Sequence, residues 1–422
     1  MENVLIAFGL MLVLLALTVP VAVAVGVATF VGLYLSGMDL GIVAQRMYAL
    51  VDSFPLMAIP FFLLSGEIMH RGQMANDLLD MCRKLVGHKT GGLATVSILT
   101  CAFYAALCGS AIATTAAVGT IMIPHMVKDG YERNFAVATS VCAGGLGPII
   151  PPSISMIMYG AFAGVSVTDM FISGIGTGAL WTICFLGASY YVVKKRGYGV
   201  KRPRASNREI LQAVWNAKWA IGVPVIILGG IYGGVATPTE SGCFAVIYAL
   251  FVECVIRRSF TVSTFIDCFQ TSLVTIGSLI FIILTANGLG ALVQYHNVMT
   301  VLTGIIHSFI PNGEVFILAM LILFLILGMF MEGTALIIIL VPILCPIAQD
   351  YGINLIQFGQ FFLISMSLGL FTPPIGTSLY LGCAIGDTNI VSLSKACMPF
   401  IVASLICLFI IGYVPAVSLF LL

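Results

Sequence analysis

The chain has 422 residues, of which 60% are hydrophobic and only 8% are charged, and its formal net charge is +1. A soluble globular protein carries roughly a quarter charged residues, so this composition excludes a water-soluble chain. It predicts an all-α integral membrane protein, because a helix satisfies its own backbone hydrogen bonds inside lipid. We expect the bilayer as its surroundings, and no nucleic-acid partner.

Apolar segments, taken in chain order, give the expected crossings. In the first half they are 3–18, 20–36, 54–70, 134–165 and 170–193, and in the second half 219–236, 241–256, 273–293, 354–386 and 397–421. Two further apolar stretches, 91–126 and 312–348, are each about as long as two short helices. The mixed segments 40–52, with Arg46, and 260–272 are expected to be interfacial helices.

Positive charge predicts the orientation of these segments, because cytoplasmic loops are enriched in lysine and arginine. The clusters that we place in the cytoplasm are Arg71/Arg83/Lys84/Lys89, Lys128/Arg133, Lys194 through Lys218, Arg257/Arg258 and Lys395. Stretch 91–126 has basic residues on both sides, so it is expected to enter and leave from the cytoplasm as a re-entrant hairpin. Stretch 312–348 has none, so it is expected to enter from the opposite face. Both termini then lie outside.

The two halves therefore read as inverted-topology repeats, 1–193 and 219–422, joined by the basic cytoplasmic linker 194–218. Matching residues recur 222 positions apart: Pro124 and Pro346, Gly130 and Gly352, Gly147 and Gly369, Pro151-Pro152 and Pro373-Pro374, Gly160 and Gly382. Inverted repeats with broken helices are the architecture of secondary transporters, whose sites lie where the broken segments meet.

Paired prolines interrupt the apolar segments 134–165 and 354–386, so each is expected to be a broken helix. A proline lacks an N–H and clashes with the carbonyl four residues earlier, so a helical chain here would orphan the carbonyls of Gly147, Pro148, Gly369 and Leu370. Such oxygens must face protein, water or an ion. They form a cage suited to a hard monovalent cation, and the half-helix that follows presents N–H groups to an anion. A simple kink is the alternative.

Acidic residues within or beside the apolar segments are the next candidates. Glu332 lies at the second hairpin tip and is a candidate pathway residue. Glu67 and Glu253 each precede an arginine by four residues, Arg71 and Arg257, and an interfacial ion pair explains both.

Other polar features have structural explanations. The run 237–240 (TPTE) has the form of a capping box with proline at the first helical position. The 12 cysteines form no CxxC pair and the five histidines show no ligand spacing, so we expect neither disulfides nor a metal site built from these side chains. The N-terminus lacks the features of a signal peptide.

These residues resemble a known family, the large membrane (M) subunit of tripartite ATP-independent periplasmic (TRAP) transporters. The motifs that carry the resemblance are 58–67 (AIPFFLLSGE), 109–111 (GSA), 150–153 (IPPS), 237–240 (TPTE) and 372–376 (TPPIG). The resemblance implies a sodium-driven elevator transporter in a bacterial inner membrane that imports an organic acid, such as a C4-dicarboxylate, a sialic acid or a sugar acid. It also implies two partners, a small four-helix membrane (Q) subunit and a periplasmic substrate-binding (P) protein.

The resemblance further implies site residues, with Na⁺ as the coupling ion. One sodium site would use Ser110, Gly147, Ile150 and Pro152, and the other would use Gly328, Gly333, Thr334, Gly369, Thr372 and Ile375. The substrate would contact Ser110, Ser153, Thr334, Thr377 and Ser378. The chain departs from the family pattern at Thr377-Ser378, where an apolar residue and asparagine are usual.

Three other functions compete with this one. The first is a self-sufficient sodium/dicarboxylate symporter or ion antiporter of the same architecture, and the second is a passive channel. The third is an intramembrane enzyme, which would need an acid–base pair that the broken segments do not offer. We therefore expect a transporter and no enzymatic activity.

Overall fold

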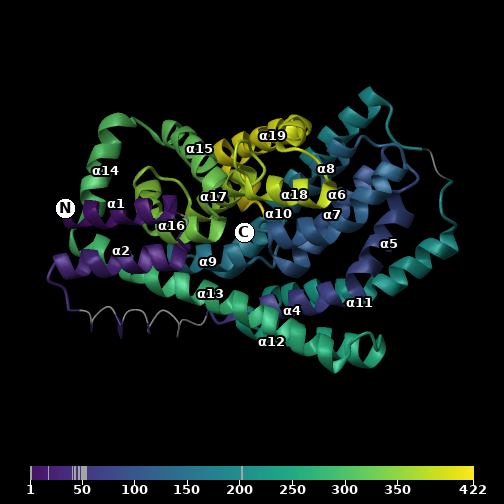
Figure 1. Ribbon diagram of the computed structural model, residues 1–422, viewed down its shortest axis with the longest axis horizontal. Helices are drawn as coiled ribbons and strands as arrows, with labels where there is room; N and C mark the ends of the chain where they lie inside the picture. The colour runs from purple at the N-terminus through teal and green to yellow at the C-terminus, as the bar shows by residue number, and fades with distance from the viewer. Residues whose placement is uncertain are drawn as a thin grey trace.

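The computed structural model describes residues 2–17, 19–39, 41, 44–45, 48, 55–200 and 203–422. Throughout this described chain the regular elements are helices (Figure 1). Up to residue 200 they are α1 (Glu2–Ala16), α2 (Val21–Leu35), α4 (Ala58–Arg71), α5 (Met74–Val86), α6 (Gly92–Cys108), α7 (Ala111–Lys128), α8 (Arg133–Gly144), α9 (Ile154–Ala163) and α10 (Val167–Arg196).

The second half continues in the same all-helical manner. Its elements are α11 (Asn207–Tyr232), α12 (Pro238–Phe251), the π-helical turn η1 (Val252–Ile256), α13 (Val262–Tyr295), α14 (Val298–Phe309), α15 (Gly313–Phe330), α16 (Gly333–Asp350), α17 (Leu355–Gly369), α18 (Thr377–Gly386), α19 (Ile390–Tyr413) and α20 (Pro415–Leu419). Among the described residues, eight helices are long and apolar enough to cross a membrane. This confirms the expected all-α membrane fold.

The helices form two packed groups, which lie above and below each other in Figure 1. The lower group contains α2, α4, α11, α12 and α13, with α1 on α2 and α5 on α11. Small residues let α2 approach α13 closely: a Cβ on Gly26 would lie 3.0 Å from the Thr285 side chain. The Thr29 hydroxyl also donates to the Thr285 carbonyl oxygen, at 3.2 Å. Close backbone approach and interhelical hydrogen bonds are what hold helices together in lipid.

Charged residues fasten the amphipathic helix α5 to this lower group. Arg257 forms an ion pair with Asp77 of α5 and donates to the carbonyl oxygen of Asn216, at 2.8 Å. The carboxylate of Glu253, fully buried in η1, accepts a hydrogen bond from the Met74 N–H at 3.1 Å and so caps the start of α5. The expected pairing of Glu253 with Arg257 is therefore wrong, because the π-helical turn directs the two side chains to different points of α5.

Two interactions expected from the sequence, an ion pair in α4 and a capping box at α12, are confirmed. Glu67 Oε1 and Arg71 Nε form the ion pair at 2.6 Å. Thr237 and Glu240 form the reciprocal capping box at the start of α12, where the Thr237 N–H donates to the Glu240 carboxylate at 2.8 Å.

One boundary differs from the sequence prediction. Residues 260–272 do not form a separate interfacial helix, because α13 runs unbroken from Val262 to Tyr295. Hydroxyl groups in this part of α13 form hydrogen bonds within the helix. For example, the Thr271 hydroxyl donates to the Asp267 carbonyl oxygen at 2.9 Å.

The linker 194–218 is also largely helical, since α10 ends at Arg196 and α11 begins at Asn207. The other expected interfacial segment, 40–52 with Arg46, lies almost wholly outside the described residues.

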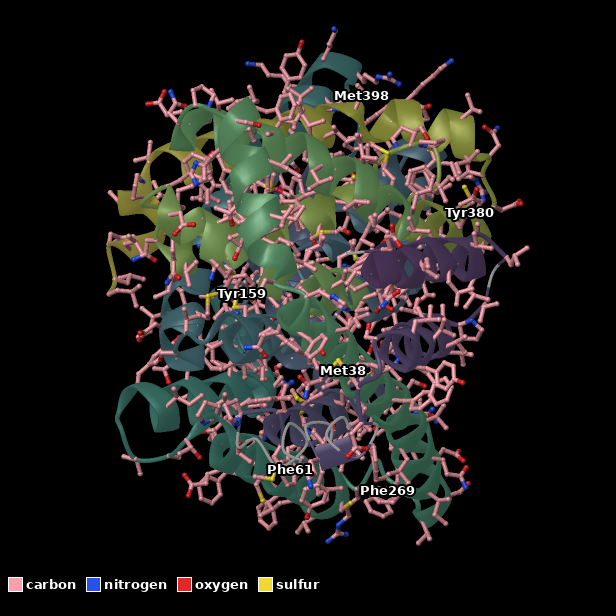
Figure 2. All side chains as sticks on the ribbon, turned by 90° about the vertical axis from the view of Figure 1, so that its left-hand side faces the viewer. Met38, Phe61, Tyr159, Phe269, Tyr380 and Met398 are labelled. Atoms are coloured by element: carbon pink, nitrogen blue, oxygen red, sulfur yellow. The ribbon has the colours of Figure 1, made fainter. Side chains whose placement is uncertain are left out.

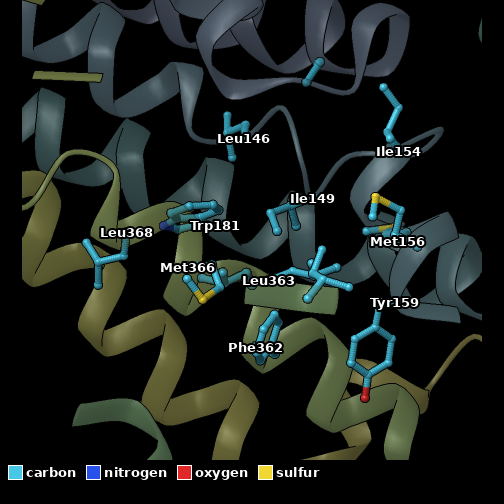
Figure 3. Close-up of a cluster of buried hydrophobic side chains, with 14 of the residues drawn as sticks. Leu146, Ile149, Ile154, Met156, Tyr159, Trp181, Phe362, Leu363, Met366 and Leu368 are labelled. Carbon is cyan, nitrogen blue, oxygen red and sulfur yellow. The ribbon is translucent and has the colours of Figure 1, made fainter. Parts of the chain in front are cut away.

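The upper group packs α6 to α10 against α15 to α19 around a core of large aromatic residues. Figure 3 shows part of this core, where Leu146, Ile149 and Trp181 lie on the side of α17 that carries Leu363 and Met366. Buried polar side chains join its helices. Trp181 Nε1 donates to the Ser404 hydroxyl at 2.8 Å, linking α10 to α19. The Gln360 amide donates to the Met170 carbonyl oxygen at 2.9 Å and accepts from the Thr177 hydroxyl at 3.0 Å, linking α17 to α10.

Replacing Gln360 tests this polar link. Gln360→Ala leaves the buried Met170 carbonyl without this donor, which costs about 1–3 kcal/mol. We expect a lower midpoint of thermal unfolding for the detergent-purified protein. Gln212→Ala, which removes an exposed glutamine from α11, is the matched control and should leave the midpoint unchanged. Equal midpoints for the two variants would contradict the structural role of Gln360.

Candidate functional site

Two helix–turn–helix pairs present their turns to the interior of the molecule. In the first pair, α6 and α7 are joined by Gly109 and Ser110. Gly109 has φ +61°, a left-handed conformation that glycine adopts readily. Ser110 caps α7, and its carbonyl oxygen accepts from the Thr114 hydroxyl at 2.7 Å. In the second pair, Met331 and Glu332 join α15 to α16. The turns lie at the tips expected for the hairpins 91–126 and 312–348.

The first broken segment lies between α8 and α9, and it is longer than the sequence suggests. The helix ends at Gly144, well before the proline pair, and the Pro151–Pro152 peptide bond is cis. Ser153 caps α9, since its hydroxyl oxygen accepts from the Met156 N–H at 3.4 Å. The same hydroxyl donates to the Pro148 carbonyl oxygen at 2.6 Å. Ser153 therefore joins the two sides of the break.

The second broken segment lies between α17, which ends at Gly369, and α18, which begins at Thr377. Here too the proline–proline peptide bond, Pro373–Pro374, is cis. The Leu370 carbonyl oxygen accepts from the Ser378 N–H at 2.9 Å, which ties the end of one half-helix to the start of the next. The two breaks thus share a cis proline pair and a hydrogen bond that closes the gap, although serine supplies a hydroxyl in one and an amide in the other.

The prediction of four orphaned carbonyls is correct for one residue and wrong for three. Ser153 satisfies Pro148, Ser378 satisfies Leu370, and the Thr372 N–H donates to Gly369 at 3.1 Å. The chain leaves the helical path before the prolines and bends back, so local donors reach these oxygens. No hydrogen bond within the described chain reaches the carbonyl oxygen of Gly147.

Carbonyl oxygens without a hydrogen bond are instead spread along both breaks. In the described part of the chain, this holds for Gly147 and residues 149–152 in the first break, and for Phe371 and residues 373–375 in the second. The carbonyl of Gly328, in the hairpin helix α15, also has none. The carbonyls of Gly369 and Thr372 accept one hydrogen bond each, and a carbonyl oxygen has two lone pairs. Such oxygens are expensive to leave unpaired in an apolar interior, and a cation is one group that can satisfy them.

Each break lies directly against the backbone of a helical hairpin, and a glycine permits the contact. A Cβ added to Gly147 would lie 2.4 Å from the carbonyl carbon of Ser110, and one added to Gly369 would lie 2.5 Å from that of Gly328. Neither side chain fits unless backbone moves. These two glycines are equivalent in the sequence repeat, but their hairpin partners are not, because Ser110 lies in the first turn and Gly328 lies within α15.

A cavity separates the two hairpin tips, and both breaks contribute to its wall. It is lined by Leu63, Gly109, Ser110, Ala111, Ile112, Pro148, Ile154, Ser155, Thr275, Leu279, Glu332, Gly333, Thr334, Ile337, Leu363, Met366, Ser367 and Leu370. The first residues of α7, α9 and α16 are among them, so three helix N-termini meet there. Helix N-termini attract anions through their free N–H groups.

The expected substrate residues divide into two sets. Ser110 and Thr334 line the cavity, and Gly333 and Glu332 lie beside Thr334. Ser153 and Ser378 are both buried and take part in the hydrogen bonds that close the breaks, whereas Thr377 is exposed at the first position of α18.

Other hydroxyl groups in the cavity escaped the sequence analysis. Ser155 could have been found by counting from Ser153 as the cap of α9, which places it in the first turn. Thr275 and Ser367 lie within the helical turns of α13 and α17, and no local sequence signal marks them. Lysine and arginine do not occur among the lining residues that the structure describes, so an anionic ligand would depend on N–H groups, hydroxyls or a bound cation.

Sequence comparison matches nearly the whole chain to one family. The family described as "Tripartite ATP-independent periplasmic transporter, DctM component" matches residues 8–417. The C4-dicarboxylate TRAP transporter large permease protein DctM of Pseudomonas aeruginosa is 37% identical over 380 residues, covering 89% of this chain and 88% of that protein. The sialic acid TRAP transporter large permease protein SiaM of Vibrio cholerae is 32% identical, covering 90% and 88%. These matches confirm the resemblance seen in the motifs.

Two further similarities concern chain length and fold. The isethionate TRAP transporter permease protein DctMQ of Oleidesulfovibrio alaskensis is 36% identical over 416 residues. The match covers 98% of this chain but only 66% of that longer protein. Among solved structures, the YdaH transporter of Alcanivorax borkumensis, which has an unusual topology, superposes with a TM-score of 0.63 at 15% identity, covering 88% of this chain and 86% of that one. This likeness concerns the fold alone.

The role of Ser153 in closing the first break can be tested directly. Ser153→Ala removes both the α9 cap and the donor to Pro148, each worth about 1 kcal/mol. We expect amide hydrogen exchange at residues 155–157 to accelerate about five- to thirtyfold. Ser166→Ala, which removes an ordinary cap from α10, should accelerate exchange only in the first turn of α10. Unchanged exchange at 155–157 in Ser153→Ala would contradict the assignment.

Proposed function

This chain belongs to the DctM component family of tripartite ATP-independent periplasmic transporters, and on that basis we propose that it is the large membrane subunit of a sodium-coupled organic-acid importer. The family is one of transporters, not of enzymes, and the chain is a multi-pass membrane protein. The sodium coupling, the substrate class and the mechanism below are parts of the proposal.

The observation that carries sodium coupling is the set of carbonyl oxygens without hydrogen bonds beside the hairpins. In the first half, Gly147 lies against Ser110 and the Pro152 carbonyl oxygen lies against Gly109, with Ile150 between them in the break. Sodium is a hard cation that binds oxygen, and neutral carbonyl and hydroxyl groups suit its single charge. We propose this set as the first sodium site.

The second half offers an equivalent set of oxygens around Gly328 and Gly369, together with Thr372 and Ile375. Gly333 and Thr334 face the cavity instead: the side chain nearest to a Cβ on Gly333 would be that of Met366, at 4.0 Å. We therefore propose that the second sodium site centres on the break and on Gly328, with Thr334 directed to the substrate.

An organic acid is the substrate class that best fits the cavity between these sites. Three helix N-termini and the hydroxyls of Ser110, Ser155 and Thr334 offer donors to a carboxylate. Sodium ions held on both sides would supply the positive charge that the side chains lack. The relatives described above are named as transporters of C4-dicarboxylate, sialic acid and isethionate, and each of these substrates is an anion. Glu332, the acid in the wall, disfavours a second negative charge near the second tip.

The proposed mechanism is elevator transport by two inverted repeats in a bacterial inner membrane, with both termini in the periplasm. The division of the helices into two packed groups supports it, because the upper group contains both hairpins and both breaks. The proposed partners are a small membrane subunit and a periplasmic binding protein that delivers the substrate. The greater length of the DctMQ relative is consistent with a second membrane component in that protein. Uptake without a binding protein would favour a self-sufficient symporter instead.

Adding a methyl group at the two contact glycines tests the sodium sites. Gly147→Ala and Gly369→Ala force the break away from the hairpin backbone, so we expect sodium-driven uptake into proteoliposomes to fall at least about tenfold, the effect of 1.4 kcal/mol. Gly187→Ala is the matched control, because a Cβ at this helical glycine meets nothing within 4 Å. Sodium dependence that is unchanged in both variants would exclude these sites.

Side-specific labelling tests the inverted orientation. Single cysteines at Lys89→Cys and Pro311→Cys, introduced after replacing the exposed Cys254, lie near the outer ends of the two hairpins. We expect a membrane-impermeant maleimide to label position 311 in intact cells and position 89 only in inverted vesicles. Labelling of both positions from one side would exclude inverted repeats.

A further inference from the structure

A second cavity opens on the outer surface, far from the hairpin tips, at the basic end of α10. Its volume is about 400 Å³, and its walls come from the start of α8, the end of α10 and the start of α19. Met398 of α19, which is labelled in Figure 2, lies beside this region at the upper edge of the molecule. Neither the sodium sites nor the substrate cavity uses any of these residues.

The charge of this cavity is positive and largely uncompensated. Lys195, Arg196 and Lys395 line it, and Glu132 is the acidic residue that the described chain contributes to the lining. Glu132 already pairs with Arg196 and accepts from the Tyr198 hydroxyl. Neither lysine has an acidic partner among the described residues.

The position of Lys395 in the sequence is unusual. It is the only lysine or arginine between residues 259 and 422. It lies in the second turn of α19 and lines the same cavity as Lys195 from the other half of the chain. Two lysines in one cavity whose acid, Glu132, is already paired with Arg196 indicate a site for an anion.

Tyrosines place this cavity at the depth of lipid headgroups. Tyr190 and Tyr191 on α10 are exposed, and exposed tyrosines of membrane proteins gather at the interface. Lys195 lies one turn closer than Tyr191 to the C-terminal end of α10, and its ammonium lies 5.8 Å from the centre of the Tyr191 ring. The positive-inside rule assigns this end to the cytoplasmic leaflet.

An exposed apolar stripe runs from the cavity along α19. Met398, Val402, Ile406 and Phe409 follow at helical spacing, and each is between 45% and 54% exposed. The stripe extends about 16 Å along the helix axis, at roughly 1.5 Å per residue. This length matches half of a hydrocarbon core about 30 Å thick, which is the reach of one acyl chain. An apolar stripe by itself only indicates contact with lipid, but here it begins at a cationic cavity.

We propose that this cavity binds the phosphate headgroup of an anionic phospholipid, held by Lys195 and Lys395, with an acyl chain along the stripe on α19. Basic pockets between helices at the cytoplasmic side recognise such headgroups. The lipid would join α10 of the first half to α19 of the second within the upper helix group. The proposal depends on the membrane location of the chain and not on its substrate or coupling ion.

Another basic cavity, near Lys84 and Arg204, fits this ligand less well. It also contains Asp80 and Glu209, and Lys84 is paired with Asp80 at 3.0 Å. Its acids offset much of its positive charge, so it serves as a contrast.

Lipid binding to the full-length chain in mild detergent tests the proposal. Native mass spectrometry would follow titration with dioleoylphosphatidylglycerol, with dioleoylphosphatidylcholine as the zwitterionic comparison. Each lysine near a charged headgroup changes affinity about fivefold, so Lys195→Gln with Lys395→Gln should weaken phosphatidylglycerol binding about 30-fold. Lys194→Gln removes the same charge from the same helix turn without touching the cavity, and it should change binding less than twofold.

Two further arms make each outcome decisive. Lys195→Arg with Lys395→Arg keeps both charges and should retain binding, which separates loss of charge from loss of fold. Inorganic phosphate and glycerol 3-phosphate are titrated in parallel to distinguish a lipid headgroup from a free phosphate. Wild-type affinity in the glutamine pair would overturn the site. Lysine-dependent binding of free phosphate as tight as that of the lipid would overturn the lipid as its ligand.

Discussion

The constraint on which this structure depends is that backbone polar groups inside a membrane must find partners. Ordinary helices meet it internally. The two broken segments do not, and the fold resolves the problem by placing each break against a helical hairpin and by using serines to close part of the gap. What remains is a set of carbonyl oxygens without hydrogen bonds along the two breaks. A position that would be a defect elsewhere thereby becomes the best candidate for binding a coupling cation.

Glycine is the residue that makes this arrangement possible. At Gly147 and Gly369 the backbone of the break touches the backbone of the hairpin, and any side chain would separate them. The same physical requirement recurs in both halves at equivalent positions, which explains why the two glycines share the offset of the proline pairs. The contacts also make hairpin and break a single packed unit, as a rigid-body movement of the upper helices would need.

Buried hydrogen bonds and ion pairs hold the remaining helices together, and unpaired charge remains at the surface of the described chain. Inside the upper group, Gln360 and Trp181 join helices through hydrogen bonds that lipid cannot replace. In the lower group, Glu253 and Arg257 hold the amphipathic helix α5 at two separate points. At the surface, Lys195 and Lys395 line one cavity whose acid is paired with Arg196, and the anion that we propose for them comes from the bilayer.

The sequence alone indicated a membrane protein built of helices, the hairpin tips and the position of both breaks. These features follow from the length of apolar segments, the segregation of charge and the prolines, all of which affect the chain near their own position. It also found Gly147 and Gly369 through their repeat. Only the tertiary structure decided which carbonyls stay unpaired, since donors such as Ser153 and Ser378 reach them through bends that no local rule specifies. The same holds for Thr275 and Ser367 in the cavity, for the unbroken α13, and for the meeting of Lys195 with Lys395. Contacts between distant segments depend on how helices pack, and packing is a property of the whole chain.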